Sequence, residues 1–91
     1  MNTYTIDFFG TCPKNGLRVA YKLKISTGEV IPVEDILAAA DLSDDKFHED
    51  IADEMLTRFG GQQTLVADHH GVRIETIRPH IAHWQKSEKQ P

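Results

Sequence analysis

The ten residues 17–26 read LRVAYKLKIS, and apolar and polar side chains alternate along them almost without a break. A period of two places the apolar set on one face of a β-strand and the polar set on the other. Asn15-Gly16 precedes this run, and both residues tolerate the positive φ values of a tight hairpin turn. Residues 3–9, before the turn, alternate as well. We therefore expect residues 3–9 and 17–26 to form an antiparallel hairpin whose odd-numbered residues 17–25 share one apolar face.

A second hairpin is expected nearer the C-terminus, over residues 63–70 and 72–78. The hinge is expected near His70-Gly71, since glycine supplies the backbone freedom that a tight turn requires. The alternation is less regular here, yet both segments contain apolar residues that can face a core. The chain therefore has four candidate strands, arranged as two hairpins.

Helical periodicity fills the middle of the chain. Apolar residues recur every four positions over residues 47–59, which creates an apolar stripe along one side of a helix. We expect Ser43 to cap the start of this helix and Gly60 to end it. A shorter helix is expected over residues 33–40, with Pro32 near its first turn.

The resulting order is β-β-α-α-β-β, which predicts an α+β fold with a four-stranded antiparallel sheet and two helices on one face. This layout leaves the other face of the sheet and two strand edges uncovered, so we expect the chain to form homo-oligomers. Residues 1–80 are expected to form a single domain. Residues 81–91 are polar and are expected to form a C-terminal tail.

The composition and the absence of long apolar runs disfavour several classes of protein. A formal net charge of −4 disfavours a broad basic surface for nucleic acid. No apolar run approaches the roughly 20 residues that a membrane-spanning helix needs, so no membrane partner is expected. The first residues lack the basic and apolar regions of a signal peptide. With a single cysteine, these features predict a cytoplasmic protein.

Cys12 is the only cysteine, and it lies in the segment FGTCPKNG of residues 9–16, where a strand runs into a turn. A lone thiol cannot form an internal disulfide, and we expect the turn beside Pro13 to present it rather than bury it. Cys12 is therefore a candidate nucleophile, which requires an accessible, electropositive environment that favours the thiolate. The alternative is a small buried apolar residue whose thiol takes no part in chemistry.

Four short strings occur in an order that resembles one known family. They are Cys-Pro-Lys-Asn-Gly at 12–16, Val-Glu at 33–34, Phe-His-Glu-Asp at 47–50 and His-Gly-Val at 70–72. With the β-β-α-α-β-β order they resemble the QueF nitrile reductases and their QueF-like relatives, which have the tunnelling fold. The resemblance covers residues 8–79, and its most specific element is Cys-Pro-x-x-Gly combined with Phe-His-Glu. It implies an oligomeric barrel that binds purines or pterins at subunit contacts.

The resemblance also implies chemistry at the nitrile of 7-cyano-7-deazaguanine, where the family's cysteine thiolate adds to the nitrile carbon and forms a covalent thioimide. Carried over, Cys12 is the nucleophile and His48 a pocket or proton-handling residue. Glu49 and Glu34 are the substrate-binding residues, with Glu49 anchoring the purine-like edge. A nitrile carbon is a modest electrophile that needs a strong, soft nucleophile. A carboxylate suits the purine edge because it accepts two parallel N–H bonds.

Two positions depart from the family's pattern. The acid that the family carries seven residues after the cysteine, thought to protonate the imide nitrogen, is Val19 here. An aliphatic side chain cannot transfer a proton, so either another group such as His48 or Asp68 takes over or the later steps differ. The lysine-rich stretch that contributes to NADPH binding in the reductases is also missing, because residues 33–40 contain no lysine.

These departures favour the QueF-like branch, whose members convert the nitrile to an amidine without hydride transfer, as in queuosine- and archaeosine-type tRNA modification. We therefore expect a thioimide-forming enzyme with no cofactor, acting on a 7-deazaguanine base or on a modified nucleoside in nucleic acid. One alternative is an NADPH-dependent 7-cyano-7-deazaguanine reductase. Another is a non-catalytic purine- or pterin-binding oligomer in which Cys12 is inert. The nitrogen donor stays open.

The histidines do not indicate a metal site. Zinc takes three or four N, S or O ligands, and the sequence contains neither His-Glu-x-x-His nor paired Cys-x-x-Cys. His69 and His70 would lie on opposite faces of a strand, and His80 and His83 fall near the expected tail. We therefore expect no bound metal.

Overall fold

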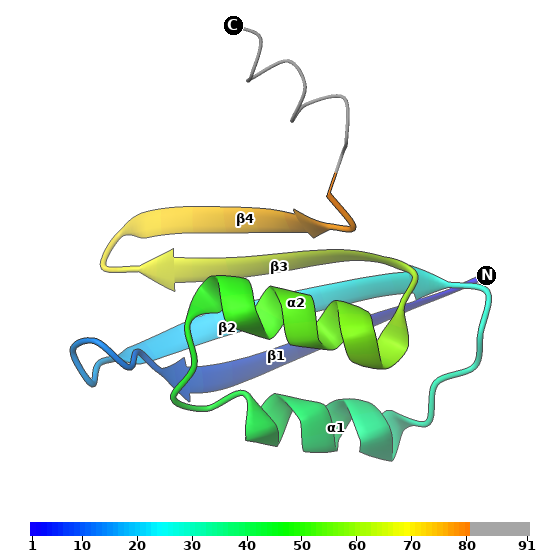
Figure 1. Cartoon of the computed structure of the whole chain (residues 1–91), viewed down its shortest axis with the longest axis horizontal. Helices are drawn as coiled ribbons and strands as arrows, with labels where there is room; N and C mark the ends of the chain where they lie inside the picture. The colour runs from blue at the N-terminus through cyan, green and yellow to red at the C-terminus, as the bar shows by residue number, and fades with distance from the viewer. Residues whose placement is uncertain (81–91) are drawn as a thin grey trace, which may run out of the picture.

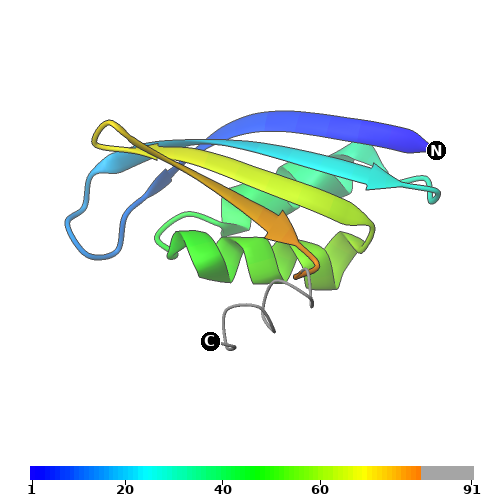
Figure 2. The ribbon, with the colours of Figure 1, turned by 90° about the horizontal axis from the view of Figure 1, so that it is seen from above.

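The computed structural model describes residues 1–80, so the polar tail expected over 81–91 lies outside the described residues. The elements follow one another as β1 (Asn2–Thr11), β2 (Arg18–Thr27), α1 (Val33–Leu42), α2 (His48–Phe59), β3 (Gln62–His69) and β4 (Val72–Arg78) (Figure 1). The four strands form one antiparallel sheet in the order β1-β2-β3-β4. Both helices lie on the same face of this sheet (Figure 2). The predicted β-β-α-α-β-β fold is therefore confirmed.

The core lies between the sheet and the helices, and β2 contributes most to it. Its side chains alternate between buried and exposed positions, as the sequence pattern predicts. Leu23 and Ile25 on β2 are fully buried, together with Leu65 on β3 and Met55 on α2. Each such side chain contributes about 1.5–3 kcal/mol when it leaves water. Leu17 is an exception to the expected pattern, since it precedes β2 and is 49% exposed.

The loop between the helices differs from the prediction. Ser43 ends α1 instead of capping α2, and its hydroxyl donates a hydrogen bond to the carbonyl oxygen of Ala39 at 2.9 Å. Asp45 then adopts a φ of 62°, a left-handed conformation that a right-handed helix cannot contain. For this reason α2 begins only at His48. Gly60, with a φ of 65°, ends α2 as predicted.

The two hairpin turns differ in kind. The β1–β2 connection is a six-residue loop, closed by hydrogen bonds from the Cys12 N–H to the Leu17 oxygen and from the Gly16 N–H to the Cys12 oxygen, both 2.8 Å long. The β3–β4 turn consists of His70 and Gly71 with φ values of 54° and 90°, as predicted. Both turns and the start of α2 lie at the same end of the molecule (Figure 1).

The second face of the sheet has no helix over it within residues 1–80 (Figure 2). It carries charged side chains, including Lys22 and Asp7, whose Nζ and Oδ1 atoms lie 3.6 Å apart, and exposed apolar ones such as Phe9 and Ile77. The outer edges of β1 and β4 pair with no described strand. Homo-oligomer formation through these surfaces stays a prediction. Neither helix in this part of the chain is long and apolar enough to span a bilayer.

Two glycines with similar φ values provide a matched test of the sheet–turn packing. A Cβ at Gly61, where φ is 70°, would lie 2.6 Å from the backbone oxygen of Ser26, whereas a Cβ at Gly16, where φ is 73°, would meet nothing within 4 Å. Gly16→Ala should cost about 1–2 kcal/mol for the left-handed backbone alone. Gly61→Ala should cost about 1–3 kcal/mol more, because the backbone must shift. Urea unfolding checks the difference, and equal losses would contradict the structure at Gly61.

Candidate functional site

Cys12 faces the helices and is buried, with 8% of its surface exposed. The expectation that the turn presents this residue is therefore wrong. Cys12 continues the alternation of β1 by one more step after Phe8 and Gly10, which places its side chain on the covered face. There it joins the apolar cluster that contains Val19 and Tyr21.

Tyr21 leans from the middle of β2 toward the Cys12 end of the sheet. Its ring stacks on that of Phe8, its cross-strand partner, with centroids 5.2 Å apart. A Cβ at Gly10 would lie only 3.0 Å from Tyr21 Cε2. Because Gly10 pairs with Val19 and not with Tyr21, this contact shows that the ring reaches one step along β1 toward Cys12. Gly10 has no side chain to prevent that approach.

His48 approaches Tyr21 from the helix side. It is the first residue of α2, it is 7% exposed, and its ring centroid lies 5.9 Å from that of Tyr21. Its Nε2 is hydrogen-bonded to the Thr76 hydroxyl on β4 at 2.8 Å. Its Nδ1 is buried and has no partner among the described residues. The structure thus joins Cys12 and His48 through Tyr21 within a single chain.

The electrostatics of this group favour neutral forms of its ring side chains. Burial lowers the pKa of His48; the charge of Glu49 raises it, while those of His69 and Arg78 lower it further. Burial also raises the pKa of Tyr21 above its usual value, and the nearby Cys12 raises it as well. At neutral pH the imidazole is therefore unprotonated and the phenol keeps its proton.

Glu49 is held by an arginine that the sequence reasoning did not identify. Arg78, at the end of β4, is 5% exposed and donates from Nη2 to Glu49 Oε1 at 2.6 Å and from Nε to Asp53 Oδ1 at 2.8 Å. Burial alone would lower the pKa of Arg78, but the two carboxylates outweigh it and raise that pKa. The Glu49 side chain is still 66% exposed, so its second oxygen is accessible from solvent. A buried arginine at this position gives no local sequence signal.

Glu34 lies far from the other candidates within one chain. It occupies the first turn of α1, next to Val33, which packs near Tyr4 and Ile6 on β1. Cys12 follows the other end of β1 (Figure 1). Cys12 and His48 therefore share Tyr21 as a neighbour, Glu49 follows His48 directly in α2, and the start of α1 with Glu34 lies at the opposite end of the molecule.

Val19 occupies the position of the missing acid and is a core residue, 2% exposed. Asp68, considered above as a substitute, lies on the uncovered face of the sheet, because it is out of phase with the buried residues Leu65 and Ala67. Its Oδ1 accepts the Gly71 N–H at 2.9 Å and so stabilises the β3–β4 turn. Asp68 therefore cannot reach Cys12 within the chain.

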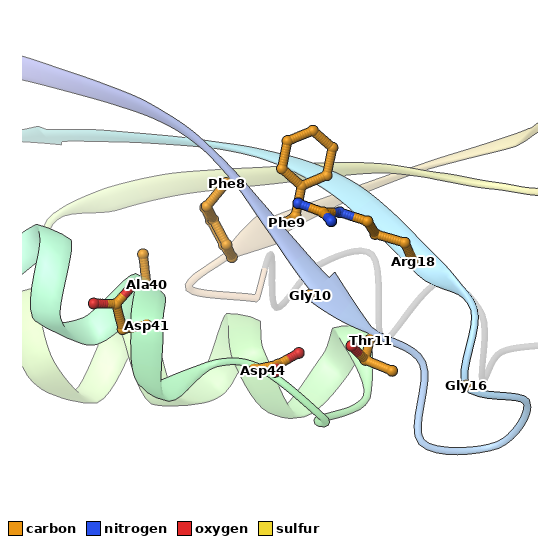
Figure 3. Close-up of a pocket in the computed structure, with 9 residues that line it drawn as sticks. All are labelled: Phe8, Phe9, Gly10, Thr11, Gly16, Arg18, Ala40, Asp41 and Asp44. Carbon is orange, nitrogen blue, oxygen red and sulfur yellow. The ribbon is translucent and has the colours of Figure 1, made fainter.

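A cavity of about 430 Å³ lies beside the Cys12 loop, between β1 and the C-terminal end of α1 (Figure 3). Phe8 and Gly10, which contact Tyr21, form part of its wall. Asp41 and Asp44 line it from the helix side, and Arg18 lines it from β2. The Arg18 guanidinium lies 4.3 Å from the centroid of the Phe9 ring. Nothing in the local sequence distinguishes these aspartates from ordinary surface residues.

Within residues 1–80, no three His, Cys, Asp or Glu side chains gather closely enough to hold a metal ion. The buried group that the structure does assemble consists of a thiol, a phenol and an imidazole. Such a group can supply a nucleophile and move protons. Sequence motifs point to the thiol and the imidazole, whereas Tyr21 is marked only by its place in the apolar alternation of the strand.

Comparison of the sequence with known protein families and with curated proteins found no match. Among solved structures, the crystal structure of the archaeosine synthase QueF-Like in the apo form is similar to this chain, with a TM-score of 0.65 and 15% sequence identity. The similarity covers 84% of this chain and 88% of that one. At this identity the likeness concerns the fold. The chain has the same β-β-α-α-β-β tunnelling fold as that structure.

Proposed function

We propose that this protein is a thioimide-forming enzyme that acts on the nitrile of a 7-cyano-7-deazaguanine base, in the manner expected of a QueF-like protein. The observation that supports this most is the buried group of Cys12, Tyr21 and His48 at one end of a QueF-like fold. An unprotonated imidazole in the same part of the core is one means of activating a cysteine nucleophile, because it can accept the proton of the thiol.

The reaction balances without a cofactor. The sulfur of Cys12 bonds to the nitrile carbon, the C≡N bond becomes C=N, and the nitrogen gains a proton, which gives the thioimide. A nitrogen donor of the ammonia or amine class then attacks the same carbon. The C–S bond breaks, an amidine forms, and the thiol is restored. No hydride is transferred at any step.

His48 is suited to take the proton of the thiol. In the tautomer whose Nε2–H donates to the Thr76 hydroxyl, Nδ1 carries a lone pair. That nitrogen is buried and has no partner among the described residues, so a proton from Cys12 can be accommodated there. The lowered pKa of His48 keeps the ring unprotonated, and hence available as a base, near neutral pH.

The base itself is proposed to enter through the cavity beside the Cys12 loop, whose volume of about 430 Å³ suits a ligand of purine size. Glu49 would accept two N–H bonds from the guanine-like edge, a role for which it must turn away from Arg78. Glu34 would come from a neighbouring copy in the proposed homo-oligomer, since α1, in whose first turn it lies, begins at the end of the molecule opposite the Cys12 loop. The substrate is a free base or a nucleoside in nucleic acid.

A second candidate function is favoured by the burial of the thiol. Cys12 is 8% exposed and packs among apolar residues, as an inert cysteine would. The protein would then be a purine- or pterin-binding oligomer without catalysis. An NADPH-dependent reductase is the remaining alternative, and NADPH oxidation accompanied by loss of nitrile would identify it.

Covalent capture tests the proposed reaction. Incubation with 7-cyano-7-deazaguanine should add the mass of one base to the intact protein, because the thioimide adds thiol to nitrile without loss of atoms. Cys12→Ala should form no adduct and keep its noncovalent affinity within a few-fold. Mass spectrometry and calorimetry check both results. Noncovalent binding by the native protein with no adduct under any condition would favour the binding function and contradict the enzyme.

The role of Glu49 is tested against its neighbour Asp53, because both bond to Arg78. Glu49→Gln should weaken binding of the base about 10- to 100-fold, since it replaces a charge-assisted acceptor worth about 1.5–3 kcal/mol. Asp53→Asn should leave the dissociation constant unchanged. Both variants should lose a similar, small amount of stability, because both carboxylates are largely exposed. If Glu49→Gln and Asp53→Asn changed the dissociation constant equally, the proposed role of Glu49 in binding the base would be contradicted.

Stability should depend on pH through His48. Its pKa in the folded chain is lowered, so below about pH 6.5 the unfolded chain takes up a proton at this residue that the folded chain resists. The contribution of His48 to the free energy of unfolding is therefore complete above about pH 6.5, and it is lost as the pH falls from there toward the lowered pKa of the folded chain. Urea unfolding between pH 5 and pH 7.5 should therefore show a weaker decline for His48→Gln than for the native chain. His70→Gln, at an exposed position, should keep the native decline.

A further inference from the structure

The proposed addition of the thiol to the nitrile requires a proton donor for the nitrile nitrogen, and no residue has yet been assigned to that role. When the C–S bond forms, the nitrile nitrogen becomes a strongly basic anion that must receive a proton. Val19 cannot supply one, and Asp68 lies on the far face of the sheet. His48 is proposed to take a proton from the thiol, so a separate donor is needed for the nitrogen. This question arises only if the proposed function holds.

Tyr21 carries a phenol, a far stronger acid than the aliphatic hydroxyl of a serine or threonine, in the same buried cluster as Cys12. It lies on the same face of β2 as Val19, two residues further along the strand. It is 3% exposed, and its ring extends over Gly10 toward the Cys12 end of the sheet. The cavity wall formed by Phe8 and Gly10 is in direct contact with this ring. Tyr21 and Cys12 do not line the cavity themselves, but the Tyr21 ring lies directly behind this part of its wall.

The contacts of the ring explain why Tyr21 is more than a core residue. The Phe8 ring stacks on one side of the Tyr21 ring, with the ring centroids 5.2 Å apart. The His48 ring approaches from another side, with the ring centroids 5.9 Å apart. These contacts fix the plane of the ring, so its hydroxyl keeps one direction. The hydroxyl is protonated at neutral pH, because burial and then the nearby Cys12 raise the pKa of Tyr21 above a usual value that already lies well above neutral.

We propose that the Tyr21 hydroxyl is the general acid that protonates the nitrile nitrogen while Cys12 attacks the carbon. The O–H bond of Tyr21 breaks as the N–H bond of the imide forms. The phenolate that results is neutralised by the proton that His48 took from the thiol. The net reaction adds S–H across C≡N, and both side chains end in their starting states. A phenol is acidic enough because the nitrogen anion is far more basic than a phenolate.

The substitution Tyr21→Phe tests this assignment, because it removes one oxygen and preserves the stacked ring. The matched control is Tyr4→Phe, at the other end of the sheet, where the hydroxyl accepts the Ile31 N–H at 3.0 Å. Each variant is mixed with saturating 7-cyano-7-deazaguanine, and the rate of adduct formation is followed by mass spectrometry. Alkylation of Cys12 by iodoacetamide is measured in parallel, since its rate reports the accessibility and reactivity of the thiol and requires no proton donor.

Tyr21→Phe should slow adduct formation on the order of 100-fold, the usual contribution of a general acid, while its alkylation rate stays within about two-fold of the native rate. Tyr4→Phe should leave both rates within about two-fold. A native rate of adduct formation in Tyr21→Phe would overturn the role of Tyr21 and leave the proposed function intact. An equal loss of both rates would also overturn it, because Tyr21 would then act only on the fold or the thiol. No adduct in the native protein would overturn both proposals.

Discussion

Burial of the apolar face of β2 is the constraint on which the rest of this structure depends. The strand pairs with β1 on one side and β3 on the other, and its buried residues meet both helices. A shift of one residue in its register would turn every apolar side chain toward water. The same register that fills the core therefore also sets Tyr21 opposite Phe8 and next to Gly10. The candidate site is a continuation of the core, built by the same alternation.

That continuity explains the character of the candidate site. A thiol, a phenol and an imidazole at the end of an apolar core are poorly solvated, so the uncharged forms of Tyr21 and His48 are favoured. The charged groups remain at the edge, where Arg78 is satisfied by two largely exposed carboxylates. The proposed proton transfers among Cys12, Tyr21 and His48 would thus take place in a poorly solvated environment, whereas the proposed binding of the base by Glu49 would take place at the solvated edge. A buried arginine with both partners in place also fixes the start of α2 against β4, and with it His48.

Much of the fold was predictable because periodicity is a local property. The strands, the His70-Gly71 turn and the end of α2 at Gly60 follow from alternation and from glycine placement. The predicted start of α2 was wrong because Ser43 can either cap the helix that follows it or bond to the helix that precedes it. The left-handed backbone at Asp45 excludes the first alternative, so Ser43 bonds to α1. Cys12 was expected at the surface because its turn suggested exposure. Its phase with Gly10 buries it, since alternation extends past the last residue of the strand.

The order of the elements, the two faces of the sheet and the motif residues that resemble the QueF-like proteins can all be read along the chain, because each depends on residues close in sequence. The tertiary structure determines which of those residues meet. It joined Cys12 to His48 through Tyr21, engaged Glu49 with Arg78 and separated Glu34 from all of them. These outcomes depend on the twist of the sheet, the lean of a ring over a glycine and the position where a helix begins. None of them is encoded in the spacing of residues along the chain, because they arise from packing between segments far apart in sequence.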